Sequence, residues 1–437
     1  MACVAHWAET AVFWHLYPLG FVGAPASAAG PDAAAPRLRR LNNWLDYLIE
    51  LGANGLLLGP VFASETHGYD TVDHYRIDPR LGTEADLVDL FEQASSRGIR
   101  VVLDGVFNHV GRGFPQLTDV VEHGYLSPFS SWFKRRADGE FNNFEGHERL
   151  VTLNHDEPQV ADYVSDVMTY WLDRGAGGWR LDAAYAVPTE FWRQVTDRVH
   201  AQHPDAWLLG EVIHGDYSSF VAKAGVDSVT QYELWKATWS SLNDRNFYEL
   251  AWALQRHEEL LETFVPQTFL GNHDVTRIAT QLVDPRHLPH ALVLLLVAVA
   301  GIPSIYAGDE QGMVGLKEQR EGGDDAIRPA FPDHPEALAP AAQETLRLHR
   351  ELIGLRRRHP WLVRARTVVE HLANEQMLLR VTDGTDTLLV ALNLGEAVVL
   401  VLPSDSWQLV SGQGQVAGGC VILAANGWCV LAPDQRA

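Results

Sequence analysis

Short apolar runs alternate with helical runs along most of the chain, and this repeat restricts the fold more than any other feature. One unit runs from Gly55–Leu58 (GLLL) through a polar loop to a helical period over Glu84–Arg97, and Arg100–Asp104 (RVVLD) begins the next unit. These apolar runs lack polar–apolar alternation, which is typical of parallel strands covered by helices. Eight runs are predicted as strands: 11–17, 55–58, 100–104, 179–183, 206–211, 226–231, 267–271 and 303–307.

Eight strand–helix units predict an α/β fold of the (β/α)8 barrel type. An open doubly wound sheet is the alternative, but no GxGxxG motif follows the first strand. An irregular, aromatic-rich stretch interrupts the repeat after the third strand, and long insertions of this kind tend to be functional. From residue 363 the pattern changes to alternating strands with turns. We expect a barrel over 1–107 and 156–362, an inserted domain over 108–155 and a C-terminal all-β sandwich over 363–437.

Charge and composition narrow the range of partners. A formal net charge of −22 over 437 residues argues against nucleic acid or anionic membranes as partners and fits a small-molecule substrate. The first residues, MACVAHWAETAVFWHLYP, lack the features of a signal peptide, so we expect a soluble cytoplasmic protein. The longest apolar stretch, Leu288–Ile302, suits a buried helix rather than a membrane span. Cys3, Cys420 and Cys429 do not make a disulfide framework and are expected to be reduced thiols.

The segment Gly178–Tyr185 (GWRLDAAY) carries a charged pair at the end of the fourth strand. Side chains on a strand alternate faces, so Arg180 and Asp182 point the same way. The guanidinium would keep the carboxylate ionised and fix its orientation, which suits a nucleophile. A structural ion pair that braces the barrel is the other interpretation of the same residues.

Polar residues follow several of the predicted strands, and the C-terminal ends of barrel strands share one mouth. Each residue alone has a structural explanation, such as a braced turn, a capped helix or a solvated loop. Their joint position at one end of the barrel favours an active site instead. These residues are His67, Tyr69, Asp70, Asp104, Asn108, His109, Arg180, Asp182, Glu211, Asn272, His273 and Asp274.

Two chemistries use clustered carboxylates. Metal-dependent hydrolysis needs histidines at ligand spacing, and no HxH or HExxH motif occurs at these strand ends. Glycoside transfer needs two acids and a third that stabilises an oxocarbenium-like state. We expect Arg180 to lower the pKa of Asp182 and the apolar strand around Leu208 to raise the pKa of Glu211. Such environments would make Asp182 the nucleophile and Glu211 the general acid/base.

Several segments together resemble the conserved regions of the α-amylase family, glycoside hydrolase family 13. The resemblance covers roughly residues 11–360, with all segments in the family's order. The segments are DGVFNH (104–109), GWRLD (178–182), GEVI (210–213) and FLGNHD (269–274), with GLLLGPV (55–61), HGYD (67–70), DPRLGTE (78–84) and GIPSIYAGDE (301–310).

The resemblance implies a role for each matching position. Asp182 corresponds to the nucleophile, Glu211 to the acid/base and Asp274 to the third acid, which distorts the sugar. Arg180 corresponds to the residue that orients the nucleophile, and His109, His273 and Tyr69 to residues that bind the sugar. Structural roles at the site fall to Asp70, Asp104 and Asn108.

Two departures from the family pattern affect the calcium site common in α-amylases. Tyr185 and Ala186 stand where a Lys-His pair is usual, and Thr152–Asn154 (TLN) stands where the family carries Asp-Leu-Asn. Asn108 is then the one ligand that remains, whereas Ca²⁺ needs about six to eight oxygens. We therefore predict no metal at this site and no cofactor.

Trp179 within GWRLD, together with DGVFNH, resembles the cyclomaltodextrinase and neopullulanase branch. Members of that branch usually carry an extra N-terminal β domain, which we expect to be missing here. The stretch GGDDAIRP (322–329) is similar to a loop that grips the non-reducing end of oligosaccharides, so Asp325 and Arg328 are candidates for substrate binding. A plain surface ion pair explains the same two residues.

These observations predict a retaining α-glycosidase that hydrolyses α-glucosidic bonds in short α-gluco-oligosaccharides by double displacement. Its two catalytic carboxyls should lie about 5–5.5 Å apart. An α-glucan transglycosylase or a disaccharide isomerase would use the same residues. An inactive sugar-binding scaffold is the alternative from another class.

Overall fold

Eight parallel strands form the centre of the molecule in the computed structural model, which describes residues 6–27, 34–320, 322–338, 343–404 and 406–434. They are hydrogen-bonded in the order β11-β10-β9-β5-β2-β1-β13-β12. A parallel bridge between Thr230 and Gln267 joins the two end strands and closes the barrel, as the sequence predicted. The strands are β1 (Phe13–Leu16), β2 (Gly55–Leu58), β5 (Arg100–Gly105), β9 (Gly178–Leu181), β10 (Trp207–Gly210), β11 (Ser228–Val229), β12 (Gln267–Phe269) and β13 (Ile302–Tyr306).

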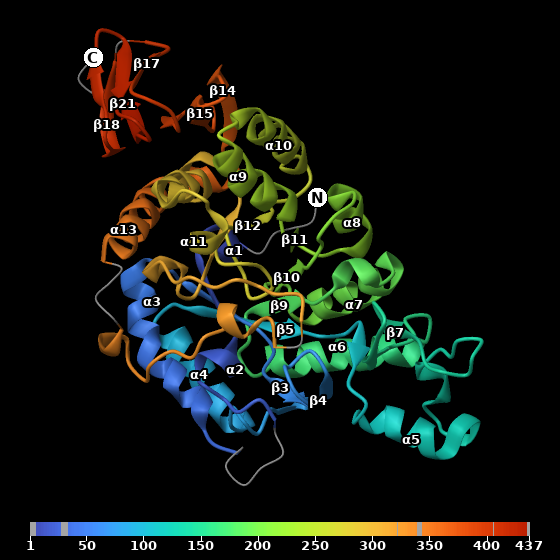
Figure 1. The fold of residues 1–437 in the computed structure, drawn as a ribbon. Coiled ribbons are helices and arrows are strands. Elements are labelled where there is room, and N and C mark those ends of the chain that lie inside the picture. The colour runs from blue at the N-terminus through green and yellow to red at the C-terminus, as the bar shows by residue number, and fades with distance from the viewer. Residues whose placement is uncertain (1–5, 28–33, 321, 339–342, 405, 435–437) are drawn as a thin grey trace.

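Helices cover the outside of the barrel (Figure 1). Local signals explain several of their ends: Thr83 and Asp86 form a capping box at the start of α4, and Gly52 ends α3 in the left-handed conformation. Two of the helices, α8 and α9, were not predicted. The helices are α3 (Leu45–Leu51), α4 (Glu84–Ser96), α6 (Pro158–Leu172), α7 (Thr189–Gln202), α8 (Tyr217–Ala224), α9 (Tyr232–Asp244), α10 (Phe247–Leu260), α12 (Leu288–Val293) and α13 (Gln343–Arg358).

Side chains inside the barrel change character along its axis. At the N-terminal end of the strands the interior is an apolar plug, in which the rings of Phe13 and Trp207 stack with centroids 5.0 Å apart. His15 lies two residues beyond Phe13 and Glu211 four residues beyond Trp207, and both are buried polar groups near the opposite end. The apolar plug consists of Phe13, Leu57, Val102, Trp207, Leu209, Val265 and Ile302, with Ala8 and Ala11.

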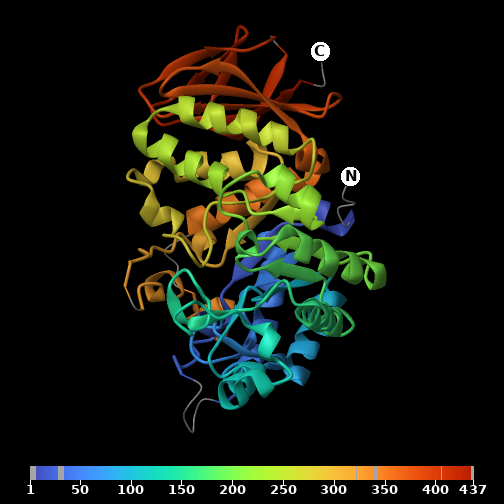
Figure 2. The same ribbon diagram turned by 90° about the vertical axis from the view of Figure 1, so that its right-hand side faces the viewer.

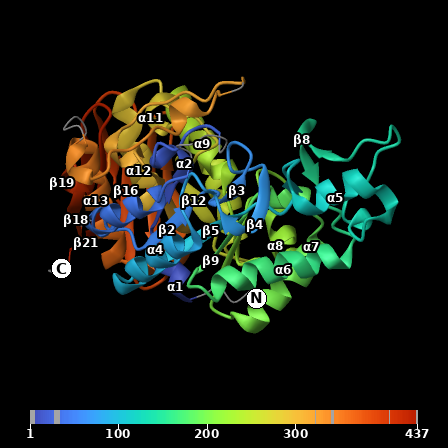
Figure 3. The same cartoon turned by 90° about the horizontal axis from the view of Figure 1, so that it is seen from below.

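Two regions that were predicted as irregular contain secondary structure. The loop after β2 holds the antiparallel pair β3 (Phe62–Ser64) and β4 (Thr71–Ile77). The insertion after β5 contains helix α5 (Pro115–His123) and the small sheet β6-β8-β7, with β8 spanning His147–Thr152. Seen from below, this insertion extends away from the C-terminal sheets (Figure 3). Its strands β6 (His109–Val110) and β7 (Asn143–Phe144) are too short for an alternating pattern to indicate them.

The C-terminal part is all-β, as predicted, and its sheets lie above α9 and α10 (Figure 2). Its larger sheet has the order β14-β15-β16-β21-β18 and its smaller sheet the order β17-β20-β19. An apolar cluster of residues from both sheets, among them Leu389, Leu400 and Val421, forms the core between them. The strands are β14 (Arg366–Leu372), β15 (Gln376–Thr382), β16 (Thr387–Asn393), β17 (Val398–Val401), β18 (Trp407–Gly412), β19 (Gln415–Ala417), β20 (Cys420–Leu423) and β21 (Trp428–Pro433).

Cys420 and Cys429 are free thiols, and Cys3 lies outside the described residues. Of the helices in the described ranges, none is both long enough and apolar enough to cross a lipid bilayer. The domain boundaries at 107/108, 155/156 and 362/363 stay predictions.

Candidate active site

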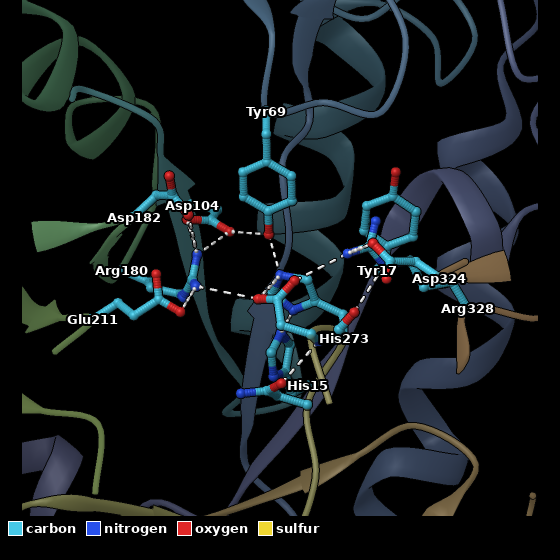
Figure 4. Close-up of polar contacts among 12 residues, drawn as sticks. His15, Tyr17, Tyr69, Asp104, Arg180, Asp182, Glu211, His273, Asp324 and Arg328 are labelled. Atoms are coloured by element: carbon cyan, nitrogen blue, oxygen red, sulfur yellow. Dashed lines mark hydrogen bonds and ion pairs between the residues drawn. The ribbon is translucent and has the colours of Figure 1, made fainter. Parts of the chain in front are cut away.

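Arg180 lies at the centre of a ring of carboxylates at the C-terminal end of the barrel (Figure 4). Its Nη1 atom is 2.7 Å from both Asp104 oxygens and 3.3 Å from Asp182 Oδ1. Its Nη2 atom is 2.6 Å from Glu211 Oε1 and 3.8 Å from Asp274 Oδ2. The guanidinium is buried, so four predicted acids share one desolvated cation.

The backbone after β9 holds Asp182 in place. The Asp182 amide donates to the carbonyl of Gly105 at 3.0 Å, which ties the nucleophile candidate to the end of β5. The next residue, Ala183, adopts φ 44° in the left-handed region, a conformation that costs free energy for a residue with a Cβ. This turn aims the amide of Ala183 at Glu211 Oε2, which accepts its hydrogen bond at 3.0 Å. Backbone strain of this kind is typical of functional sites.

Glu211 follows β10, and its amide donates to the carbonyl of Leu181 at 2.9 Å. The hydroxyl of Tyr232 donates to Glu211 Oε1 at 3.2 Å, and the side-chain amide of Asn272 donates to that hydroxyl at 2.8 Å. Tyr232 was not among the predicted site residues. It begins α9, a helix that was also missed, so no strand-end rule pointed to it.

The third acid, Asp274, is held by its neighbour His273 and by Arg328 from another loop. Its Oδ2 atom is 3.0 Å from His273 Nε2, and its Oδ1 atom is 3.0 Å from an Nη2 of Arg328. The Asp274 side chain is 30% exposed, against 10% for Asp182 and 9% for Glu211, so it lies nearest to solvent. The Tyr69 hydroxyl hydrogen-bonds to His273 Nε2 and donates to Asp104 at 3.2 Å.

Arg328 lies at the site, and its ion pair within GGDDAIRP is with Asp324, at 2.9 Å, whereas the side chain of Asp325 is exposed. GGDDAIRP offers two adjacent aspartates, and only the short 3₁₀ turn over Asp325–Ile327 decides which one faces the arginine. Substrate binding by Asp325 stays a prediction. Arg328 also covers the ring of Tyr17 at 4.6 Å and donates to the carbonyl of His273 at 2.8 Å.

The residues predicted from the first conserved region line another side of the site. His109 is buried, its ring stacks on Phe144 of the insertion with centroids 4.8 Å apart, and its Nε2 atom forms no hydrogen bond within the described residues. Burial lowers the pKa of His109 to about 3, so this ring is neutral. Asn108 is 3.0 Å from His109 Nδ1. Asp70 braces the loop after β2 by accepting from the amide and hydroxyl of Thr66.

The electrostatics differ from the prediction in one respect. Burial, together with the negative charge of Glu211, raises the pKa of Asp182 well above its ordinary value, although Arg180 acts to lower it. Arg180 thus acts in the expected direction, but burial and the charge of Glu211 outweigh it, so the expected net lowering of the Asp182 pKa is wrong. Burial also acts on Asp274, but there the charges of His273, Arg328 and Arg180 prevail and hold its pKa well below the ordinary value.

The positions that correspond to the family's calcium ligands are engaged within the protein. Asn154 donates to the carbonyl of Ser131 at 2.7 Å, and the Tyr185 hydroxyl donates to Glu145 at 2.8 Å. Within the described ranges, no group of three or more His, Cys, Asp or Glu side chains is arranged to hold a metal ion. That no calcium binds here stays a prediction.

Comparison with known proteins agrees with this geometry. The family model for the α-amylase catalytic domain matches residues 34–137 and 125–333. A cyclomaltodextrinase of Geobacillus thermopakistaniensis is 30% identical over 473 residues, covering 98% of this chain and 78% of that protein. The debranching enzyme of Nostoc punctiforme superposes with a TM-score of 0.85 at 27% identity, over 99% of this chain and 100% of that one.

A third relative was solved with a carbohydrate bound. It is the cyclic α-maltosyl-(1→6)-maltose hydrolase of Arthrobacter globiformis in complex with cyclic α-maltosyl-(1→6)-maltose. It superposes with a TM-score of 0.83 at 26% identity, over 98% of this chain and 99% of that one. Fold, carboxylate ring and family model agree, and the chain belongs to the α-amylase family of glycoside hydrolases.

Proposed function

We propose that this protein is a retaining α-glycosidase that hydrolyses α-glucosidic bonds in short α-gluco-oligosaccharides of the maltooligosaccharide and cyclodextrin type. The observation that carries the proposal is the contact of one guanidinium, that of Arg180, with both Asp182 and Glu211 at the barrel mouth. The contact of two acids from the ends of neighbouring strands with one guanidinium supports a carboxyl separation short enough to act on one glycosidic bond. The named activities of the relatives support a substrate of α-linked glucose units.

Double displacement assigns each acid one task. In the first step Glu211 gives its proton to the leaving oxygen, the bond between that oxygen and the anomeric carbon breaks, and a carboxylate oxygen of Asp182 bonds to the carbon. In the second step Glu211 takes a proton from water, the water oxygen bonds to the same carbon, and Asp182 leaves. The sugar ring flattens between bond breaking and bond formation, and the ionised carboxylate of Asp274 binds its hydroxyls.

The shared charge of the site supports this proton arrangement. Burial and the negative charge of Glu211 raise the pKa of Asp182, so simultaneous ionisation of the two carboxyls is disfavoured. A proton on Glu211 relieves this repulsion, and the first step consumes that proton. The roles of the two acids follow from their positions directly after β9 and β10, not from separate pKa values.

The experiment separates the two steps with an α-glucosyl fluoride, whose leaving group needs no protonation. The Glu211→Gln variant should consume it and accumulate a glycosyl group on Asp182, visible by mass spectrometry, while Asp182→Asn should leave it intact. NMR of the wild-type products should show the α anomer first. An initial β anomer, or turnover by Asp182→Asn, would contradict the proposal.

Product analysis then defines the class of reaction. On maltose, isomaltose, trehalose, sucrose, cyclodextrin and pullulan, hydrolysis should release sugars shorter than the substrate. Longer oligosaccharides at high maltose would show transglycosylation, and an isomeric disaccharide would show isomerisation. Binding of maltose without turnover of any substrate would indicate a scaffold. The cytoplasmic location expected from the sequence is part of the proposal and is testable by cell fractionation.

A further inference from the structure

A second histidine stands directly behind His273, and sequence analysis did not point to it. His15 lies on β1, is buried, and places its Nε2 atom 3.1 Å from His273 Nδ1. The two rings meet edge to face, with centroids 5.0 Å apart and planes at 82°. The ring of Tyr306 from β13 also packs on His15, with ring centroids 5.6 Å apart. His15 is thus packed against two rings, with one ring nitrogen directed at His273 (Figure 4).

The other nitrogen of His273 faces the reacting side of the site. Nε2 is 3.0 Å from Asp274 Oδ2 and also contacts the Tyr69 hydroxyl. That hydroxyl donates its own hydrogen to Asp104, so its oxygen can accept from His273. A carboxylate accepts hydrogen bonds and donates none. Asp274 therefore favours a proton on Nε2, and the Tyr69 oxygen can accept from it.

The two nitrogens of an imidazole are linked, because the partner of one decides whether the other carries the proton. If His15 donates to Nδ1 of His273, the neutral ring must carry its hydrogen on Nε2. If His273 is an imidazolium, Nδ1 donates to His15 and Nε2 is again protonated. Burial holds the pKa of His15 well below its ordinary value, so His15 stays a neutral ring that can serve in either arrangement.

We propose that His15 is a positioning residue for the reaction, which keeps the proton of His273 on Nε2 and so keeps that N–H directed at Asp274 and the bound sugar. The expected effect of His15 on kcat rests on the proposed function. It explains why a polar ring occupies β1 two residues beyond Phe13, where the strand would otherwise continue the apolar plug. His15 touches no substrate and acts through His273.

Two substitutions of the full-length enzyme separate hydrogen bonding from packing. His15→Gln keeps an amide that can donate to, or accept from, His273 Nδ1. His15→Phe keeps a ring that packs on Tyr306 and has no nitrogen. We expect kcat to fall about 10- to 100-fold in His15→Phe with a smaller change in KM, as for other buried partners of site residues, and to stay close to wild type in His15→Gln.

Ser304→Ala is the matched control. Ser304 lies on β13, its buried hydroxyl forms no hydrogen bond within the described residues, and its backbone pairs with Phe13. It therefore reports on the effect of altering the barrel interior without altering the pair of histidines. We expect Ser304→Ala to match wild type in kcat and KM.

A second readout does not depend on turnover. Two-dimensional ¹H–¹⁵N spectra of histidine-labelled protein, assigned with a His273→Gln variant, should show a proton on Nε2 of His273 in wild type and in His15→Gln. In His15→Phe this proton should be distributed between the two nitrogens. Equal loss of kcat in His15→Gln and His15→Phe, an unchanged kcat in His15→Phe, or a wild-type His273 protonated on Nδ1 alone would overturn the inference. If the enzyme turned over no α-glucoside, the proposed function would fail while the spectra still tested His15.

Discussion

The same strands build both ends of the barrel interior, but one end is an apolar core and the other carries the candidate active site. On β5, Val102 belongs to the apolar plug and Asp104 to the carboxylate ring. Leu209 on β10 belongs to the plug, and Glu211, directly after the strand, belongs to the ring. Each change takes two residues, the repeat that returns a side chain to the same face of a strand. The ends are therefore one continuous interior with a sharp boundary.

The difference shows how one scaffold meets two opposed demands. Burial of apolar side chains in the plug stabilises the fold without regard to direction. At the mouth, several carboxylates lie around Arg180 in the same desolvated space. This arrangement lowers the stability of the fold, but it fixes the orientation of the carboxylates. We therefore expect substitutions at the plug to lower stability without changing activity. Substitutions at the mouth should lower activity and raise stability.

The largest effect is expected for Asp182→Asn. Since no covalent intermediate can form on an amide, kcat should fall by about 10⁵-fold or more, measured on an activated α-glucoside. At pH 7 the same variant should unfold at a higher temperature than wild type, because it removes one of several like charges around Arg180. A variant that lost activity together with stability would contradict the division of the interior.

At the plug, Ile302→Ala should have the reverse signature. Ile302 is fully buried among apolar side chains, so the cavity should lower the free energy of unfolding by about 2–5 kcal/mol, measured by urea denaturation. Below the unfolding transition its kcat should equal that of wild type. A large loss of kcat in the folded variant would show that the plug also shapes the mouth.

The pH dependence of the free energy of unfolding tests whether the pKa of Asp182 is raised at the mouth. An acid whose folded pKa is raised binds more protons in the folded than in the unfolded state, so its contribution to stability falls as pH rises above the ordinary aspartate pKa of about 3.9. Between pH 5 and pH 7, wild type should lose up to about 1.4 kcal/mol per pH unit relative to Asp182→Asn. Urea denaturation of both proteins across this range measures the difference, and parallel curves would count against a raised pKa.

The smallest effect is expected on removal of metal ions. Because the positions of the family's calcium ligands are occupied by Tyr185, Ala186 and Thr152–Asn154, a chelator should leave the melting temperature unchanged. Differential scanning calorimetry with and without EDTA checks this. A drop in melting temperature that added Ca²⁺ restores would show a site that the sequence comparison missed.

Much of the fold could be predicted because the signal was local. The run Gly55–Leu58 is confirmed as a strand to the residue, and the helical period over Glu84–Arg97 is confirmed as α4, which ends one residue earlier, at Ser96. The missed elements lack such signals. Helix α8 is short and marked mainly by its N-cap, Asp216, and the sheet of the insertion is made of strands held by pairing between distant residues such as His109 and Thr152.

The candidate site was predictable to a similar extent. Residues directly after strands, among them Asp182 and Glu211, were identified because a parallel barrel brings all such positions together. His15 lies within a strand and Tyr232 at a helix start, where no sequence rule marks them as polar partners of the site. The sequence could not show that Asp324 rather than Asp325 pairs with Arg328, because adjacent identical residues are equivalent in sequence and differ only in space.

Which segments become strands, and which acids follow them, can be read from the chain, because hydrophobic periodicity, helix caps and strand ends depend on neighbouring residues. The electrostatic environment of those acids depends on the tertiary structure. Arg180 meets residues that are up to 94 positions away, and its charge is divided according to distances that only closure of the barrel creates. Burial and Coulomb interactions add up over every group in space, so the raised pKa of Asp182 is a property of the folded ring and not of the segment that carries it.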